Sequence, residues 1–284
     1  MCERIYRAVA SLQYKKGDII TIKNLANFTD LNGELADLNG ELACVQGYDN
    51  EEEKYKILVK NAKILIKSDN IQLAVEIKES QVCSSNGLYV TADVKAGQCI
   101  LVEEIYAAPD IHPDVSQAWS LVEKWLTEKP PTFHEELAGN ETFANKYLNE
   151  LKNKEDKDLL DKLSEKYGKE TKLIFNKCIT NFFRSPVSNQ SFLSRYATKM
   201  NHSKSQNVAS STITMNPGTV FKLDTSNAES GQAQLVTLHE THGPPQEMNV
   251  VFALTDIAEG EELLYDYGDE HVKLMCDQLR TVQK

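Results

Sequence analysis

The sequence of 284 residues predicts an α+β protein in which a small β-barrel precedes a larger β-rich domain that carries a helical insert. Three observations predict this architecture. Short runs rich in β-branched and aliphatic residues fill the start of the chain, a helical period replaces them in the middle, and strand-like runs return near the end. We expect the first domain at residues 1–78 and the second at residues 79–284.

The first domain contains four strand-like runs separated by turn signals. A tight hairpin is expected where only Asn61 separates two of the runs. Several short strands in so short a segment are typical of a small SH3-like barrel. The four runs are DIITIKNL, ELACVQGY, KYKILVK and AKILIK.

A repeat interrupts this region, because DLNGELA occurs twice in succession between Asp30 and Ala43. Coiled coils also repeat every seven residues, but two copies fall short of the three or four heptads that a coiled coil needs. We therefore interpret the repeat as a local duplication that lengthens one loop.

The second domain begins with strand-like runs in NGLYVTADVKAGQCILVEE and then changes period. The helical insert is expected at about residues 107–190, where Pro130-Pro131 should end the first helix and Gly168 should cap a later one. Strands return at SSTITM, QLVTL and MNVVFALTDI, and a closing helix is expected at about residues 270–281. One face of the first helix carries Val115, Trp119, Val122 and Leu126.

The net charge of -11 lies mostly in the second domain. Residues 1–78 hold 11 of the 31 basic and 12 of the 42 acidic side chains, which leaves 20 basic and 30 acidic ones for the remainder. An acidic body repels nucleic-acid phosphates and attracts cationic partners such as a lysine-rich peptide, although solubility alone also explains the charge. Direct binding of nucleic acid is therefore not expected.

Cysteine usage and the chain start indicate an intracellular protein. The six cysteines are scattered without a C-x-x-C pair, which favours reduced thiols over a zinc site made of cysteines. The opening MCERIYRAVA lacks the apolar core of a signal peptide, and no apolar run approaches the roughly 20 residues that span a bilayer. LHETHG places His239 and His242 three residues apart but is not H-E-x-x-H, so no metal site is expected.

Two polar stretches interrupt the apolar strands of the second domain. KMNHSKSQN, residues 199–207, would by itself be interpreted as a turn with a core histidine. EGEELLYDYGDE, residues 259–270, would by itself fit a strand whose alternate tyrosines pack on one face. Its carboxylates fit either attraction of a basic peptide or a solvated turn, and they include Glu261, Glu262, Asp266, Asp269 and Glu270.

Together with SNGLY at residues 85–89, these stretches resemble the SET-domain protein lysine methyltransferases. That family reads roughly x-Gly-x-Gly-(Leu/Val)-(Phe/Tyr), then Asn-His-Ser-Cys-x-Pro-Asn, then Gly-Glu-Glu-Leu-x-(Phe/Tyr)-Asp-Tyr, and the resemblance covers about residues 79–284. The run LLYDYGD is similar to mono-methylating histone enzymes, whereas the helical insert and ILVEEIYAAP look more like the subgroup with a split SET domain.

The sequence departs from the family pattern at several positions. Ser85 replaces the first glycine of the cofactor loop, and Lys204 and Gln206 replace the frequent Cys and Pro. No cysteine cluster follows Tyr267, so the resemblance does not extend to the zinc-binding cap of some histone enzymes.

The resemblance implies a knot-like core, with S-adenosylmethionine in a cleft on one side and the substrate lysine in a narrow channel on the other. Asn201 would bond the methionine moiety, the backbone of His202 would bond the adenine, and Gly87 would permit close approach of the cofactor. The implied cofactor-binding residues are Asn86, Gly87, Leu88, Tyr89, Asn201 and His202.

The resemblance also assigns catalytic roles to two tyrosines. A lysine side chain with a pKa near 10.4 is mostly cationic at neutral pH, so the site must favour its neutral form. Tyr267 would orient the amine and the methyl group through a hydroxyl that stays neutral. Tyr265 would hold a water that leaves no room for a methylated amine to turn, so mono-methylation is expected.

The expected partner is a lysine-containing protein or peptide. Histone tails are favoured by the tyrosine strand and the acidity, whereas non-histone proteins are favoured by the helical insert and the missing zinc cap. The competing class is a SET-fold interaction protein that has lost catalysis. The expected compartment is the nucleus or the cytoplasm, with the nucleus slightly favoured.

Overall fold

The computed structural model divides the chain into two compact units, each built from two chain segments. The first unit contains Met1–Glu103 and Ser205–Tyr265, and the second contains Glu104–Lys204 and Asp266–Lys284. The domain boundary expected near residue 78 stays a prediction. The structure describes residues 13–25, 38–60, 62–82, 86–107, 117–128, 130–137, 139, 141–150, 154–184, 191–224 and 234–267.

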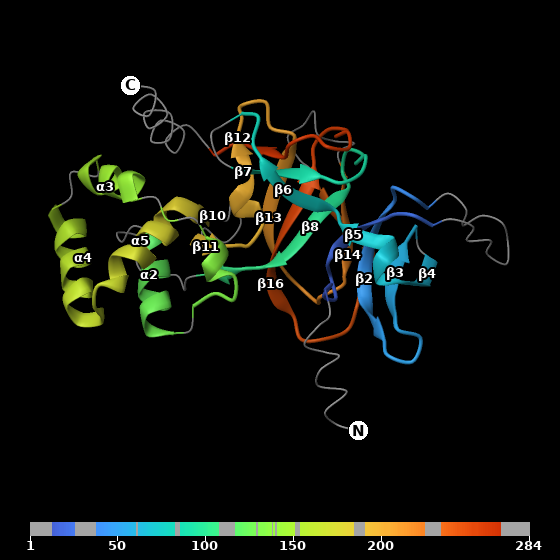
Figure 1. Ribbon diagram of the computed structural model, residues 1–284, viewed down its shortest axis with the longest axis horizontal. Helices are drawn as coiled ribbons and strands as arrows, with labels where there is room; N and C mark the ends of the chain where they lie inside the picture. Colours follow the sequence, from blue (N-terminus) through green and yellow to red (C-terminus); the bar gives the residue numbers. More distant parts are fainter. Residues whose placement is uncertain are drawn as a thin grey trace. The chain divides into compact units, whose positions relative to one another are not determined.

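The first unit begins with five antiparallel strands in the order β4-β3-β2-β1-β5 (Figure 1). Among the described strands no pair joins β4 to β5, so the sheet is open and the expected SH3-like barrel is not confirmed. Closure depends on the tilt and stagger of the first and last strands, which β-propensity does not encode. The strands are β1 (Ile19–Ile22), β2 (Leu42–Asp49), β3 (Lys54–Val59), β4 (Ala62–Ile66) and β5 (Ile71–Leu73), with the 3₁₀ turn η2 (Ser68–Asn70) before β5.

One face of this sheet forms its own apolar core. Side chains alternate between the two faces of a strand, so Ile57 and Val59 of β3 point to the same side and are fully or almost fully buried. Tyr55, on the same face, contacts Tyr14 edge to face with ring centroids 5.3 Å apart. The expected hairpin is present, since β3 and β4 pair directly and the chain turns at Lys60, which has a φ of 44°.

The three stretches that resemble the SET family are called the first motif (SNGLY, residues 85–89), the second motif (KMNHSKSQN, residues 199–207) and the third motif (EGEELLYDYGDE, residues 259–270). The first unit also contains strands that flank the second and third motifs. β13 pairs with β16 over eight residues, and β8 joins the other edge of β16. The strands expected at SSTITM, QLVTL and MNVVFALTDI are therefore confirmed. The strands are β6 (Val75–Glu79), β7 (Asn86–Val90), β8 (Cys99–Glu104), β13 (Val208–Met215), β14 (Val220–Asp224), β15 (Gln234–His239), β16 (Gln246–Ala253) and β17 (Leu264–Tyr265).

The second unit is mainly helical, as the period of the insert predicts. Trp119 and Val122 are buried as expected, and Trp119 stacks on Phe175 with ring centroids 4.7 Å apart. Gly168 ends α4 with a φ of 95° and donates its N–H to the carbonyl of Ser164, so the predicted C-cap is confirmed. The helices are α2 (Gln117–Thr127), α3 (Glu141–Glu150), α4 (Lys154–Tyr167) and α5 (Glu170–Asn181).

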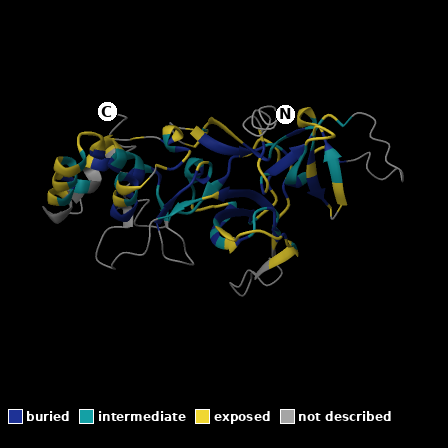
Figure 2. Ribbon diagram, turned by 90° about the horizontal axis from the view of Figure 1, so that it is seen from below, coloured by how far each residue is buried: buried dark blue, intermediate teal, exposed yellow. Residues whose placement is uncertain are grey.

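The helices bury one side and expose the other, so exposed residues (yellow) alternate with intermediate and buried ones (teal and dark blue) along the helical ribbons in Figure 2. None of the helices in the described ranges is long and apolar enough to cross a membrane. The closing helix expected at about 270–281 lies outside the described residues. The remaining elements of this unit are β9 (Tyr106–Ala107), β10 (Phe183–Arg184), β11 (Ser191–Leu193), β12 (Asn201–His202), and the 3₁₀ turns η3 (His134–Glu136) and η4 (Ala197–Lys199).

Candidate functional site

The first sequence motif lies directly beside the start of the third within the first unit. The N–H of Leu263 donates to the carbonyl of Leu88 at 2.7 Å, and the N–H of Val90 donates to the carbonyl of Glu261 at 3.1 Å. The turn that begins the third motif is fixed at Gly260, which has a φ of 81° and donates to the carbonyl of Val90 at 3.0 Å. β7 (Asn86–Val90) and the GEEL segment, residues 260–263, are therefore one hydrogen-bonded structure.

Glu262, within the third motif, is buried. The sequence predicts instead that it attracts a basic peptide or belongs to a solvated turn. Glu262 is 9% exposed, and its carboxylate accepts a hydrogen bond from the Ser80 hydroxyl at 2.9 Å. The Tyr89 hydroxyl lies 3.0 Å from this carboxylate and 3.0 Å from the carbonyl of Glu79, so it can donate to either. The Tyr89 hydroxyl in turn accepts the N–H of Gln81 at 3.2 Å. A buried carboxylate needs such partners, and here they fix the segment that enters the first motif. The turn-like GEE sequence gives no sign of this burial.

Asn207, the last residue of the second motif, fastens the third motif to the end of β16. Its side chain accepts the N–H of Leu264 at 2.7 Å and donates to the carbonyl of Glu262 at 2.9 Å. Its backbone donates to the carbonyl of Leu264 and accepts the N–H of Leu254 at 2.8 Å. The sequence reasoning missed this role, although the position of Asn207 in the family pattern could have indicated it.

In the second unit, Tyr267 is fixed by the second motif at both its backbone and its hydroxyl. Its N–H donates to Nδ1 of His202 at 3.1 Å, and its hydroxyl donates to the carbonyl of Met200 in a short hydrogen bond. The rings of Tyr267 and His202 are 5.3 Å apart, and Phe183 meets the Tyr267 ring edge to face at 6.4 Å. Because Nδ1 accepts a hydrogen bond, the imidazole carries its proton on Nε2.

Asp266 also turns toward the second motif rather than only toward solvent. Its Oδ1 lies 3.4 Å from Nζ of Lys204 and 3.7 Å from Nδ1 of His202. Lys204 is one of the departures from the family pattern, and it supplies a cation for this carboxylate. At least part of the acidity expected to attract a peptide is therefore used within the protein.

The predicted site residues fall into two groups, one in each unit. Asn86 is exposed, whereas Gly87, Leu88 and Tyr89 are buried in β7 of the first unit. Tyr265, in β17 of the first unit, is half-buried. In the second unit, Asn201, His202 and Tyr267 are half-buried, and His202 and Tyr267 are in contact. The catalytic and cofactor roles of these residues stay predictions, and Ser85 lies outside the described residues.

Among the described residues, no group of three or more His, Cys, Asp or Glu side chains is arranged to hold a metal ion. His239 ends β15, and His242 follows in the connection to β16. The LHETHG sequence therefore places its two histidines at the end of a strand and in a loop.

Comparison with known proteins agrees with the sequence motifs. The family model of the SET domain matches residues 85–268. A similar solved structure is a Plasmodium falciparum protein described as a candidate histone methyltransferase, with 12% identity, 69% of this chain and 95% of that chain covered, and a TM-score of 0.32. Another is the SET domain of LSMT bound to lysine and AdoHcy, with 10% identity, coverage of 69% and 49%, and a TM-score of 0.36.

The chain thus spans about half the length of the LSMT chain, and no curated protein sequence matches it. Both TM-scores are low, so the assignment depends on the family model and on the motifs that lie within it. That model covers well over half of the 284 residues, including SNGLY, NHSKSQN and GEELLYDY. The chain therefore belongs to the SET-domain family.

Proposed function

We propose that the protein is a protein-lysine N-methyltransferase that transfers a methyl group from S-adenosylmethionine to a lysine side chain. The observation that carries the proposal is the anchoring of Tyr267, whose backbone is bound by His202 and whose hydroxyl is bound by the Met200 carbonyl. A tyrosine kept only for packing would not need its hydroxyl and its backbone fixed by the same polar motif.

Tyr267 suits the positioning of an amine. The bound cofactor would supply an electrophilic methyl group on a sulfonium sulfur. The Tyr267 hydroxyl donates its hydrogen bond to the Met200 carbonyl, so the lone pairs of its oxygen can accept an N–H from a neutral lysine amine. That contact would leave the amine lone pair free to form the new N–C bond as the S–C bond breaks. The amine must already have lost its proton, because a protonated amine has no lone pair.

The proposed cofactor residues have the chemistry that the cofactor needs. Asn201 carries a carboxamide that both donates and accepts hydrogen bonds, which fits the ammonium and carboxylate of the methionine moiety. The Asn201 and His202 side chains are half-buried, and Asn86 is exposed beside Gly87, which has no Cβ. We assign the cofactor to Asn86, Gly87, Leu88, Tyr89, Asn201 and His202.

We further propose that mono-methyl-lysine is the main product and that a histone is the favoured substrate. Tyr265 lies two residues before Tyr267 and is half-buried, so its hydroxyl can restrict the space around a methylated amine. The substrate proposal is supported by the LLYDYGD run and by the net charge of -11, which attracts a cationic tail. We propose an intracellular location with the nucleus favoured, and a non-histone substrate is the alternative.

A labelled-methyl assay tests the proposal. The full-length protein is incubated with S-adenosylmethionine labelled in its methyl group, and with core histones or a cell lysate as acceptor. We expect label on lysine, and about 10²–10³-fold slower labelling with Tyr267→Phe. Binding of unlabelled cofactor, measured by calorimetry, separates the outcomes. Absence of both binding and transfer would indicate a SET-fold interaction protein, and binding without transfer to histones would favour another acceptor.

A further inference from the structure

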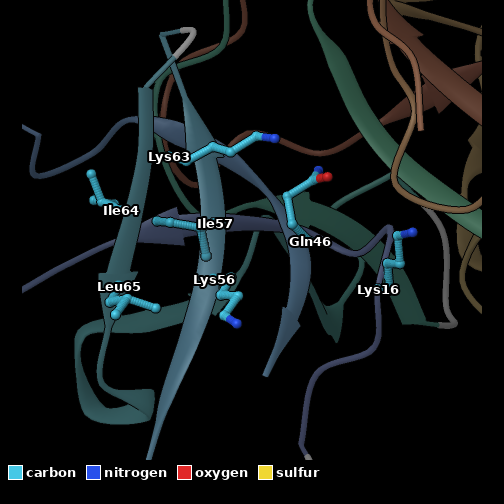
Figure 3. Close-up of a pocket in the computed structure, with 7 residues that line it drawn as sticks. All are labelled: Lys16, Gln46, Lys56, Ile57, Lys63, Ile64 and Leu65. Atoms are coloured by element: carbon cyan, nitrogen blue, oxygen red, sulfur yellow. The ribbon is translucent and has the colours of Figure 1, made fainter. Parts of the chain in front are cut away.

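A groove of about 410 Å³ lies on the N-terminal sheet, among β2, β3, β4 and the segment before β1 (Figure 3). Its lining combines cationic and aliphatic side chains, and no carboxylate belongs to it. All of the lining lies within the first unit. We call this site the lysine groove, and its main residues are Lys16, Gln46, Lys56, Lys63, Ile64 and Leu65.

The groove is a concentration of positive charge on an acidic protein. The β3–β4 hairpin, residues 54–67, contains five lysines and no carboxylate, whereas the whole chain has a net charge of -11. Three of these lysines have carboxylate partners outside the hairpin: Lys54 lies 3.3 Å from Glu52, Lys56 lies 3.0 Å from Asp49, and Lys60 lies 2.7 Å from Glu41. Lys16 and Lys63 form no ion pair with any residue in the described part of the chain. Two ammonium groups at the groove are therefore available for an anion.

The side chains of Gln46 and Lys16 in the groove are held in place by contacts with neighbouring residues of the same unit. Nε2 of Gln46 donates to the carbonyl of Gly218 at 3.0 Å and approaches Sγ of Cys44 at 3.4 Å. Its Oε1 is left as an acceptor for a peptide N–H. The Lys16 stem packs against Gly218, where an added Cβ would lie only 2.9 Å from Cε of the lysine. Restraint of these side chains before binding reduces the entropy lost when a ligand is bound.

The aliphatic part of the groove lies at the free edge of the sheet. β4 pairs only with β3 among the described strands, and its Leu65 is only half-buried, whereas the neighbouring Ile64 projects to the other face and packs against the core of the sheet. Leu65 lies opposite Lys56, so the two side chains project from the same face. A ligand that fits here needs both carboxylates and apolar side chains.

We propose that the lysine groove binds an acidic, leucine-rich or similarly aliphatic peptide segment of a partner protein. Its carboxylates would meet Lys16 and Lys63, its backbone would donate to Gln46, and its aliphatic side chains would cover Leu65. This interaction is separate from methyl transfer, because it uses none of the proposed catalytic or cofactor residues. A nucleic acid fits less well, since the lining has no aromatic side chain on which a base can stack and the chain as a whole repels phosphates.

The test is fluorescence anisotropy with the full-length protein and no cofactor. The probe is a short fluorescein-labelled peptide of alternating glutamate and leucine, and the reference probe carries glutamine in place of glutamate. We expect the glutamate peptide to bind more tightly than the glutamine peptide and to weaken as salt is added. The double variant Lys16→Glu, Lys63→Glu should weaken binding by about tenfold or more, because two attractions become repulsions.

A matched control separates the effect of the groove lysines on peptide binding from the effect of the net charge of the protein. Lys162→Glu with Lys172→Glu changes two exposed lysines of α4 and α5 and gives the same net charge, so binding should stay within about twofold. If Lys16→Glu, Lys63→Glu fails to fold by circular dichroism, Lys63→Gln replaces it, with an expected loss of about threefold. Equal losses in the groove and control variants, or no preference for glutamate, would overturn the proposal. Tighter, groove-dependent binding of single-stranded RNA would also overturn it.

Discussion

The third motif contains two neighbouring regions that are held in different ways. Residues 260–264, in the first unit, are fixed by backbone hydrogen bonds to β7, by the Asn207 side chain and by the buried Glu262 carboxylate. Tyr267, in the second unit, is half-buried and is positioned by its contacts with Met200 and His202. The first region is built like a core and the second like a reactive site. Substitutions should therefore separate stability from activity within eight residues of chain.

The largest expected effect is on activity and follows from Tyr267→Phe. The variant keeps the ring contact with Phe183 but loses the hydroxyl that we propose to orient the amine. The rate of methyl transfer should fall about 10²–10³-fold, a typical loss for one catalytic polar group, while the free energy of unfolding should change by no more than about 1 kcal/mol. Label incorporation and urea unfolding measure the two quantities. Tyr167→Phe, at the half-buried last residue of α4, is the control, and equal rates for both variants would contradict the proposed role.

The next effect should be on stability and follows from Glu262→Ala. Loss of the carboxylate removes one buried acceptor shared by the hydroxyls of Ser80 and Tyr89, although the Tyr89 hydroxyl keeps the Glu79 carbonyl within reach, so the free energy of unfolding should fall by about 2 kcal/mol. Glu261→Ala is the neighbouring control. Glu261 is exposed and its carboxylate accepts the N–H of Ala258, so the substitution should cost less than about 1 kcal/mol. Equal unfolding midpoints for the two variants would remove the contrast between buried and exposed glutamates.

A smaller effect is expected when the acceptor for the Tyr267 backbone is changed. His202→Asn keeps a side-chain oxygen near the position of Nδ1, whereas His202→Leu offers no acceptor. We expect His202→Leu to transfer methyl about tenfold more slowly than His202→Asn, with cofactor affinity the same for both, because the proposed adenine contact uses the backbone. Calorimetry and initial rates measure the two. If the asparagine and leucine variants are equally slow, the hydrogen bond does not position Tyr267.

The smallest effect on total rate should come from Tyr265→Phe. Removal of this hydroxyl enlarges the space around the amine, so the fraction of dimethyl- and trimethyl-lysine should rise while total turnover changes by less than about threefold. Mass spectrometry of a methylated histone peptide resolves the three states. A product that is mostly dimethylated or trimethylated in the unaltered enzyme would contradict the proposal of mono-methylation.

The features that sequence patterns predicted well are local ones. The burial of Trp119 and Val122 is predictable because an apolar residue every three or four positions falls on one face of a helix. The helix end at Gly168 is predictable because glycine readily adopts the positive φ that ends a helix. The order of the three SET motifs identified the family from residues that lie far apart in the chain.

The features that the patterns missed depend on what each residue meets in three dimensions. Glu262 belongs to a sequence that resembles an exposed turn, and its burial becomes evident only when Ser80 and Tyr89 lie against it. The expected closure of the barrel is not confirmed for a related reason, since short strands predict a sheet but not whether its last strand reaches its first. Asn207 was overlooked because its four hydrogen bonds reach Glu262, Leu264 and Leu254.

The pairing of Leu88 with Leu263 has a consequence for how the protein folds during synthesis. These residues are separated by well over half of the chain, and β8 likewise pairs with the late strand β16. β7 can pair early with β6, but its contact with residues 261–263 and the pairing of β8 with β16 must wait until the ribosome has added nearly all of the polypeptide. Non-local pairing of this kind slows folding and exposes strand edges to aggregation. Production of the protein should benefit from slower translation or from added chaperones, more than a helical protein of the same length would.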